Sequence, residues 1–297
     1  MSRSDAAAET VPVLGAGRLT TATSPTILLG RVLGNAALLL GVFLTAMPFI
    51  YMITASLKPG GELYSIPFSI LPKSLYLGNY ELLFGQTSFV RWFANSVFVS
   101  LARTVLAIFL ALMAGYAFAK FDFRFKNVLF LIVLGTLTLP IYVLIVPLYE
   151  MMISLDWIDS YWSLIIPFGA QAIGVFLARQ HFLSIPNELL EAARIDGAGE
   201  WSIFQQIVLP LATPIIAVMA ILFFTASWRD YIWPLIVLTD DAKFTVSLGL
   251  PSLIGPYRQE YGAVMAGSFL STVPIVAVFL VMQRRFIEGI MAGAVKG

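Results

Sequence analysis

The stretch WFANSVFVSLARTVLAIFLALMAGYAFA, residues 92–119, decides the fold class. It runs for 28 residues with one charged side chain, Arg103. An α-helix rises about 1.5 Å per residue, so about 20 apolar residues cross the hydrocarbon core of a bilayer. A membrane β-barrel would instead show segments of about ten residues with alternating polarity. This stretch therefore predicts a transmembrane helix.

The rest of the chain repeats this pattern. Five further uncharged runs have 19 or more residues, at 32–57, 127–149, 160–178, 201–228 and 261–283. Of the 297 residues, 59% are hydrophobic and 12% charged, against about 25% charged in soluble domains. We predict an all-α integral membrane protein with six transmembrane helices at about 32–57, 92–119, 127–149, 160–180, 206–228 and 262–284. The run 244–257 is too short to span and contains two prolines, which favours a re-entrant, interfacial or loop segment.

Lysine and arginine predict the orientation. With the N-terminus in the cytoplasm, eleven of these residues lie on the inner side and six on the outer side. Because cytoplasmic loops carry the excess of cations, both termini are expected inside. The predicted organisation is a flexible cytoplasmic tail at 1–30, a transmembrane domain at 31–290 with a cytoplasmic loop at 184–206, and a cytoplasmic tail at 291–297.

Several kinds of chemistry are excluded by the residues themselves. The chain has no cysteine and one histidine, so we expect no metal site, and it has no recognisable catalytic motif. No lysine follows a glycine, so the phosphate-binding loop of ATPases is missing. The net charge of +1 gives no basic excess for nucleic acid. The chain is expected to be a conduit whose energy comes from another protein.

Polar groups inside the predicted spans are candidates for a translocation path. Arg103 lies near the middle of its span, where a charge costs on the order of 2.5–3.5 kcal/mol on insertion scales. Asn95 and Gln171 are the other candidates, and hydrogen bonding between helices is the alternative for all three. Small residues repeat at helical spacing around Arg103 and predict a helix-packing face: Ser96, Ser100, Thr104, Ala107 and Ala111. The six tryptophans fall near span ends, which favours an interfacial belt over stacking against a sugar.

The segment SIPNELLEAARIDGAGEWSIFQQIVLP, residues 184–210, predicts a short helix on the cytoplasmic side. Pro186 ends the preceding helix, Asn187 is the expected N-cap, and Glu188 suits the first turn. Gly197 suits the left-handed position after the last turn. A short amphipathic helix on the membrane surface can dock in a groove of a soluble partner.

This segment resembles the EAA loop of ABC importer permeases. The pattern is Glu-Ala-Ala, three residues, Gly, nine residues, then Ile-x-Leu-Pro, and every spacing is kept from Glu191 to Pro210. Further stretches resemble the maltose-type, carbohydrate-uptake subfamily of inner-membrane components, among them SLKPGGEL at 56–63, AGYAFAKFDFRFKN at 114–127 and QRRFIEGIMAGAVKG at 283–297. The resemblance covers about residues 46–297.

The resemblance implies a type I ABC importer permease fold and a set of partners. A second permease, as a heterodimer, would complete the pathway, two cytoplasmic ATPase subunits would bind ATP and Mg, and an extracytoplasmic solute-binding protein would deliver a di- or oligosaccharide or related polyol. This chain would bind no cofactor and would lie among lipids in a bacterial or archaeal cytoplasmic membrane. By motif, the residues coupling to the ATPase are Glu191, Ala192, Ala193, Arg194, Asp196 and Gly197. The tail 293–297 also matches the family's ending and is expected to reach the ATPase dimer.

Three other functions stay open at this point, one of them a membrane anchor or scaffold for cytoplasmic proteins. A permease for glycerol phosphate or another non-sugar solute would carry the same motif. A self-contained facilitator is the second alternative, because the lack of acidic residues in the runs argues against proton coupling but not against facilitated passage.

Overall fold

The structure, a computed structural model, describes residues 25–67, 69–255 and 258–294. The chain divides into two units, Met1–Pro48 and Phe49–Gly297. Most of the predicted N-terminal tail (1–24) and the last three residues of the C-terminal tail lie outside the described residues. The fold is helical apart from one antiparallel pair of short strands, β1 (Ile254–Gly255) and β2 (Arg258–Gln259).

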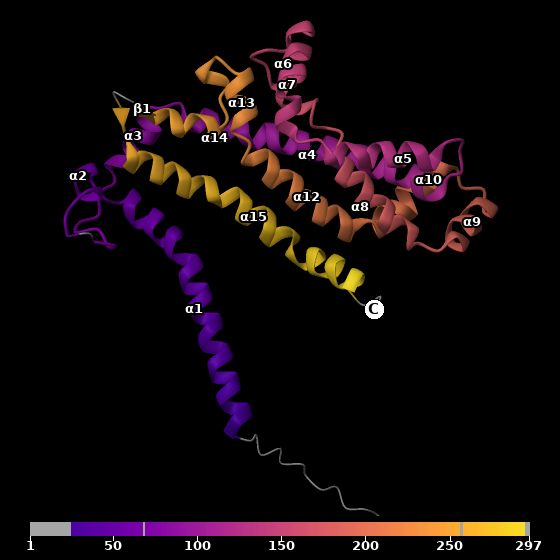
Figure 1. Cartoon of the computed structure of the whole chain (residues 1–297), viewed down its shortest axis with the longest axis horizontal. Helices are drawn as coiled ribbons and strands as arrows, with labels where there is room; N and C mark the ends of the chain where they lie inside the picture. Colours follow the sequence, from indigo (N-terminus) through magenta and orange to yellow (C-terminus); the bar gives the residue numbers. More distant parts are fainter. Residues whose placement is uncertain (1–24, 68, 256–257, 295–297) are drawn as a thin grey trace, which may run out of the picture. The chain divides into compact units, whose positions relative to one another are not determined.

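Four helices have 16 or more residues (Figure 1): α1 (Pro25–Ser56), α4 (Phe89–Lys120), α12 (Thr213–Trp228) and α15 (Tyr261–Ala294). The shorter α-helices are α2 (Gly60–Leu63), α3 (Gly78–Gly85), α5 (Lys126–Gly135), α6 (Ile145–Ser154), α7 (Tyr161–Ile165), α8 (Ala172–Leu183), α9 (Asn187–Ile195), α10 (Glu200–Ile203), α11 (Leu209–Leu211), α13 (Ile232–Val237) and α14 (Val246–Gly249). Four short segments are 3-10 helices: η1 (Thr136–Thr138), η2 (Ile141–Leu144), η4 (Asp241–Lys243) and η5 (Pro251–Leu253). One segment, η3 (Phe204–Val208), is a π-helix.

Three helical segments are long and apolar enough to cross a membrane, Leu29–Ser56, Phe89–Lys120 and Tyr261–Phe286. Two further segments qualify if each bent pair counts as one span. The pair Lys126–Thr138 and Ile141–Ser154 is bent by 95°, and the pair Glu200–Leu211 and Thr213–Trp228 by 74°. The structure therefore has three to five candidate spans within its described residues. Several helices extend past the predicted limits, because a charged residue ends an apolar run without ending the backbone hydrogen-bond ladder.

Two of the helix breaks fall at prolines. Pro140 separates η1 from η2, and the run at 160–180 is interrupted after α7, where Pro167 lies in the non-helical residues before α8. Proline lacks the N–H that the helix ladder needs and clashes with the preceding turn. Prolines within the predicted spans are expected to kink or break a helix, and Pro140 and Pro167 lie at such breaks, whereas Pro147 and Pro274 lie inside α6 and α15. The bend between α11 and α12 was not predicted, although Pro210 and Pro214 occupy the first turns of these two helices.

Helix α4 is central in the second unit, where it packs along α8 and α12. The predicted stripe of small residues on α4 is buried, which confirms the packing face. On the facing helix, a Cβ added at Gly174 would lie 2.9 Å from the Cβ of Ala111 and 2.8 Å from Phe223. Such distances are too short for ordinary contacts, so the two helices approach each other only because one of them carries glycine here.

The interfacial interpretation of the tryptophans is wrong for three of the six. The side chains of Trp92, Trp228 and Trp233 are at most 4% exposed. Each indole N–H donates to a backbone carbonyl inside the protein, for example from Trp233 to Ser163 at 2.8 Å. A buried indole contributes a large apolar area provided that its N–H finds an acceptor. These three residues therefore belong to the protein core, whereas Trp162 and Trp201 are exposed.

An ion pair ties the loops on the predicted outer side together. Lys243 Nζ lies 2.6 Å from Asp159 Oδ2, and the backbone N–H groups of Thr239 and Asp240 donate to Asp159 Oδ1 at 3.0 Å. Partial burial by itself would raise the pKa of Asp159, but these hydrogen bonds and the lysine charge outweigh it and lower the pKa to about 2. The carboxyl group is therefore ionised at any physiological pH.

Candidate functional site

The predicted cytoplasmic helix forms as α9 (Asn187–Ile195), with Glu188 in its first turn and Arg194 in its last, as the helix dipole favours. The predicted N-cap is wrong by one residue. Pro186 occupies the cap position, and Asn187 is the first helical residue. The Asn187 side chain accepts a hydrogen bond from Lys120 Nζ at 2.7 Å, so it fastens α9 to α4 instead of capping it.

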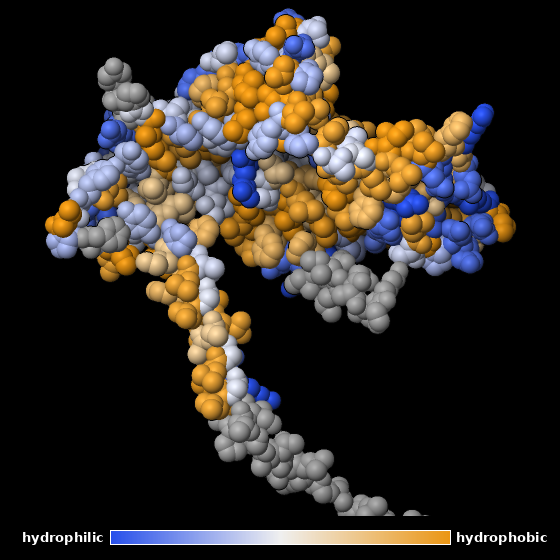
Figure 2. Space-filling model, in the orientation of Figure 1, coloured by the Kyte–Doolittle hydropathy of each residue, from blue (hydrophilic) through white to orange (hydrophobic). Residues whose placement is uncertain are grey.

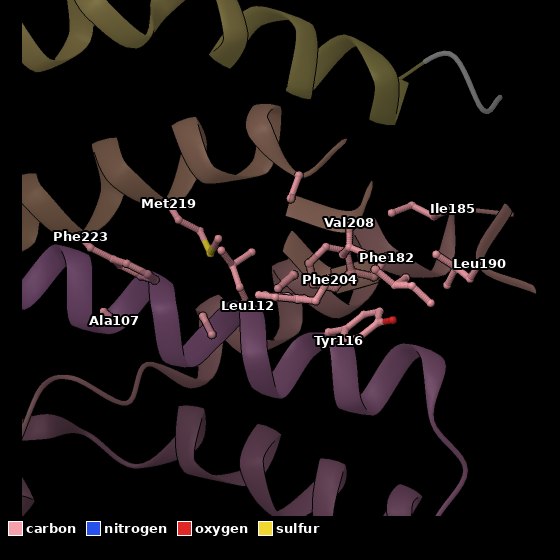
Figure 3. Packing of buried hydrophobic residues seen from close by; sticks show 14 residues of the cluster. Ala107, Leu112, Tyr116, Phe182, Ile185, Leu190, Phe204, Val208, Met219 and Phe223 are labelled. Carbon is pink, nitrogen blue, oxygen red and sulfur yellow. The ribbon is translucent and has the colours of Figure 1, made fainter. Parts of the chain in front are cut away.

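One leucine anchors α9 to the helix bundle. Leu190 is 1% exposed and belongs to a buried cluster that includes Phe182, Ile185, Tyr116 and Phe204 (Figure 3). The cluster draws these residues from α4, α8, the α8–α9 connection and η3, so α9 rests on the ends of several helices at once. Lys120 Nζ also donates to the carbonyl of Ile185 at 2.6 Å. The helix is therefore held by one apolar anchor and one lysine.

Gly197 forms the turn that ends α9. Its φ is +86°, the left-handed region that side chains with a Cβ rarely adopt. The N–H of Gly197 donates to Arg194, and the N–H of Ala198 donates to Ala193 at 2.9 Å, which closes the last turn. An added Cβ at Gly197 would meet nothing within 4 Å. The backbone conformation, and not lack of space, requires glycine here.

The six predicted coupling residues lie on α9 and the turn that follows it. Glu191, Ala192, Arg194, Asp196 and Gly197 are exposed, and Ala193 is half-buried against the cluster around Leu190. Two apolar side chains beside them also face outward, Leu189 at 44% exposed and Ile195 at 86%. Hydrophobic side chains cover much of the face in Figure 2, whereas hydrophilic ones gather at the end that carries α9 and α10. The exposed surface of α9 thus combines the carboxylates of Glu188 and Glu191 with a small apolar patch, which is typical of a helix that docks into a groove.

Two residues that the sequence did not single out brace this surface. Glu200 accepts from Arg194 Nε at 2.6 Å and from Arg194 Nη2 at 3.3 Å, and the Tyr116 hydroxyl lies 3.4 Å from the same carboxylate. The bidentate pair fixes the orientation of the arginine across the turn at Gly197. The sequence feature that could have predicted this ion pair is the opposite charge of Glu200, six residues after Arg194 on the same loop.

The three residues proposed for a translocation path are not together. Asn95 donates to the carbonyls of Ala242 and Phe244 and accepts from the Tyr161 hydroxyl, so it connects α4 to the outer loops. Arg103 and Gln171 instead line one cavity of about 600 Å³. Arg103 Nη1 lies 3.0 Å from Asp230 Oδ2, a partner that the sequence analysis did not identify.

Comparison with known proteins agrees with this geometry. Residues 104–290 match the family described as binding-protein-dependent transport system inner membrane component. The chain is 40% identical over 258 residues to the arabinooligosaccharides transport system permease protein AraQ of Halalkalibacterium halodurans, covering 86% of this chain and 92% of the relative. It is 34% identical to the sn-glycerol-3-phosphate transport system permease protein UgpE of Brucella abortus, covering 88% and 96% of the two chains. It is 33% identical to the lactose transport system permease protein LacG of Rhizobium radiobacter, covering 88% and 94%.

Solved structures share the fold. A chain of a bacterial ABC transporter involved in the import of the acidic polysaccharide alginate superposes with a TM-score of 0.77 at 23% identity, covering 89% of this chain and 98% of the other. A chain of the bacterial alginate ABC transporter in complex with its pentasaccharide-bound periplasmic protein gives a TM-score of 0.59 at 16% identity, covering 85% and 93%. The chain belongs to the family of inner-membrane components of binding-protein-dependent transport systems, the permease subunits of ABC importers.

Proposed function

We propose that this chain forms half of the translocation pathway of an ATP-driven importer for a di- or oligosaccharide or related polyol, and that α9 couples it to a cytoplasmic ATPase. The observation that carries the proposal is α9 itself, a helix fastened to the bundle by Leu190 with Glu191 and Ala192 of its Glu-Ala-Ala motif exposed. Glu191 would make a charge-assisted contact with the ATPase, and Ala192 would allow close approach. Arg194 and Asp196 would flank the contact, and Gly197 would hold the turn.

Carbohydrate is the substrate class that the relatives' names favour. Two of the relatives described above are permeases for arabinooligosaccharides and lactose. The alternative is a glycerol phosphate, because the relative at 34% identity is a permease for sn-glycerol 3-phosphate. Uptake measurements with one member of each class therefore decide the substrate.

The proposal includes a full assembly in a bacterial or archaeal cytoplasmic membrane. A second permease would complete the pathway, two ATPase subunits would hold ATP and Mg, and an extracytoplasmic binding protein would supply the solute. This permease would hydrolyse no ATP itself. It would cross the membrane six times with both termini in the cytoplasm, and α7 with α8 would serve as the span that lacks a single long helix.

Transport by reconstituted vesicles tests the function. The complex co-purified with its ATPase should take up arabinotriose or lactose only when ATP is supplied on the ATPase side. Uptake at the same rate without ATP would identify a facilitator and refute the proposal. Uptake of sn-glycerol 3-phosphate alone would support the alternative substrate.

A charge reversal tests the coupling surface. Glu191→Lys should reduce ATPase co-purification or the amount of sugar transported per ATP, because it reverses the one charge of the exposed motif. Asp122→Lys is the matched control, since Asp122 is fully exposed and pairs with Lys126 in an exposed contact worth little. Transport by the Glu191 variant at the wild-type rate would remove Glu191 from the coupling surface.

A further inference from the structure

The cavity that contains Arg103 lies where three helical segments are interrupted. Its wall includes Tyr142 from η2, beside the break at Pro140, Phe168 and Gln171 from the break between α7 and α8, and Asp230 from the break between α12 and α13. Its volume of about 600 Å³ falls within the range of small-molecule sites, about 300–1,000 Å³. In secondary transporters, breaks in membrane helices bring backbone and polar groups to the substrate site.

The polar centre of the cavity is a charge pair with unused hydrogen-bonding capacity. The side chains of Arg103 and Asp230 are 11% and 21% exposed, so both reach the cavity but neither is fully solvated. The Arg103 guanidinium lies 4.0 Å from the centre of the Phe168 ring, which fixes its plane. A guanidinium has five N–H donors, and within the described residues only Nη1 makes a hydrogen bond, to Asp230 Oδ2. The remaining donors and the second carboxylate oxygen are available to a ligand.

The other lining groups suit a sugar ring. Gln171 donates to the carbonyl of Phe168 at 2.8 Å, which positions its amide at the cavity wall and leaves its amide oxygen as an acceptor. Phe168, Tyr142 and Trp233 supply apolar surface. Sugar hydroxyls both donate and accept hydrogen bonds, and a guanidinium, a carboxylate and an amide offer both kinds of partner in one place.

The charge balance distinguishes a neutral ligand from an anion. Asp230 compensates the charge of Arg103, so a phosphate group placed beside the arginine would also meet the carboxylate. The second cation of the wall, Arg229, is exposed to solvent, so water weakens its field. The centre of the cavity is therefore close to neutral and selects against a phosphate ester.

We propose that this permease holds a neutral sugar unit of its substrate in this cavity, between Arg103, Asp230 and Gln171. The inference rests on the proposed function as an importer, and it adds that this subunit contacts the solute and contributes to the choice between a sugar and a phosphate ester. The pathway would then have a binding group on this subunit in addition to any on its partner.

Because the chain has no cysteine, a single introduced thiol reports on the cavity. Ala170 is exposed in the cavity wall and has no binding role in the proposal, so Ala170→Cys in the assembled complex should react with a maleimide. Saturating arabinotriose or lactose, whichever the wild-type complex transports, should slow the reaction at least 5-fold. sn-Glycerol 3-phosphate at the same concentration should leave the rate unchanged. Ser74→Cys, exposed and outside the cavity, is the matched control and should react at one rate in every condition.

One variant keeps the test independent of folding. Gln171→Leu preserves the Arg103–Asp230 pair, so the complex should assemble with wild-type yield while the apparent KM for sugar uptake rises at least 5-fold. A second variant, Asp230→Asn, removes the carboxylate, so in complexes that assemble sn-glycerol 3-phosphate should now protect the thiol in the Ala170→Cys background. The inference is overturned if the transported sugar gives no protection, or if the phosphate ester protects equally without the Asp230 change. A wild-type complex that transports neither sugar would instead refute the proposed substrate class.

Discussion

Leu190 fixes α9 to the helix bundle, and replacing it with alanine measures how much of the order of α9 depends on that contact. The helix has nine residues, and isolated helices shorter than about 12–15 residues are marginal in water. Its order must therefore come from packing. Leu190 is 1% exposed, and a Leu→Ala change at a buried position costs about 2–5 kcal/mol.

This loss of packing free energy predicts a measurable increase in the population of undocked α9. At about 1.4 kcal/mol per factor of ten, even 2 kcal/mol raises the open population of α9 by about 30-fold. Hydrogen–deuterium exchange of the assembled complex, followed on peptides covering 187–197, should therefore accelerate by at least about 30-fold. The amount of sugar transported per ATP should fall, because an undocked helix transmits less force to the bundle.

Leu183 provides the matched control. It is the last residue of the preceding helix α8, but it is 49% exposed and lies outside the docking surface of α9, so Leu183→Ala deletes the same atoms without opening a cavity. Exchange of α9 should stay within about 3-fold of wild type in this variant, since surface substitutions usually change stability by about 0.5 kcal/mol or less. Equal exchange in the two variants, or wild-type exchange in Leu190→Ala, would refute the anchoring role.

Three further predictions concern the turn, its ion pair and the outer loops. Gly197→Val should cost about 1–3 kcal/mol of local strain and lower coupled transport, whereas Gly199→Val, at φ −72°, should transport normally. Arg194→Ala should change the melting temperature of the complex by less than about 2 °C, because an exposed ion pair is worth at most about 1 kcal/mol. Any loss of ATP-coupled uptake in this variant would therefore reflect the ATPase contact. Because the pKa of Asp159 is lowered to about 2, its contribution to folding should be complete above its ordinary value near 3.8 and lost only as the pH falls towards 2. Asp159→Asn should therefore speed amide exchange around Lys243 at pH 7, and equal exchange in variant and wild type would contradict the role of this pair.

The sequence predicted what depends on local pattern. The run 92–119 anticipated α4 within three residues at its start and one at its end, because a long apolar stretch has few alternatives in a membrane. The turn at Gly197 followed from the rarity of a left-handed residue with a side chain. The predicted N-cap at Asn187 is wrong because Lys120 of α4 donates to the same side chain. The two residues are 67 positions apart, so the local sequence pattern does not reveal this contact.

The cavity could not be predicted for a related reason. Arg103 and Asp230 are 127 residues apart. Asp230 lies just beyond the end of an apolar run, where the sequence pattern indicates a loop. Pairing inside a membrane is nevertheless the expected fate of an intramembrane arginine. The sequence does indicate that an unpaired Arg103 would be costly in the membrane, so that a carboxylate partner is expected. It does not indicate which carboxylate that partner is.

Helix α4 connects the two sites in a single element. Arg103 lies near its middle, whereas Tyr116 and Lys120 in its last turns contact Glu200 and Asn187 at the two ends of the coupling segment. Thirteen residues at about 1.5 Å each separate Arg103 from Tyr116, about 20 Å of one continuous helix. Its buried face is lined by small residues against α8 and α12, which suits small sliding movements of packed helices. Displacement of α9 by an ATPase would therefore act on the same rigid body that carries one half of the charge pair, so movement of α4 relative to α12 would change the distance between Arg103 and Asp230. In the proposed importer, coupling between ATP hydrolysis and solute release would then need one helix with two positions, and it would not need a relay of many side chains.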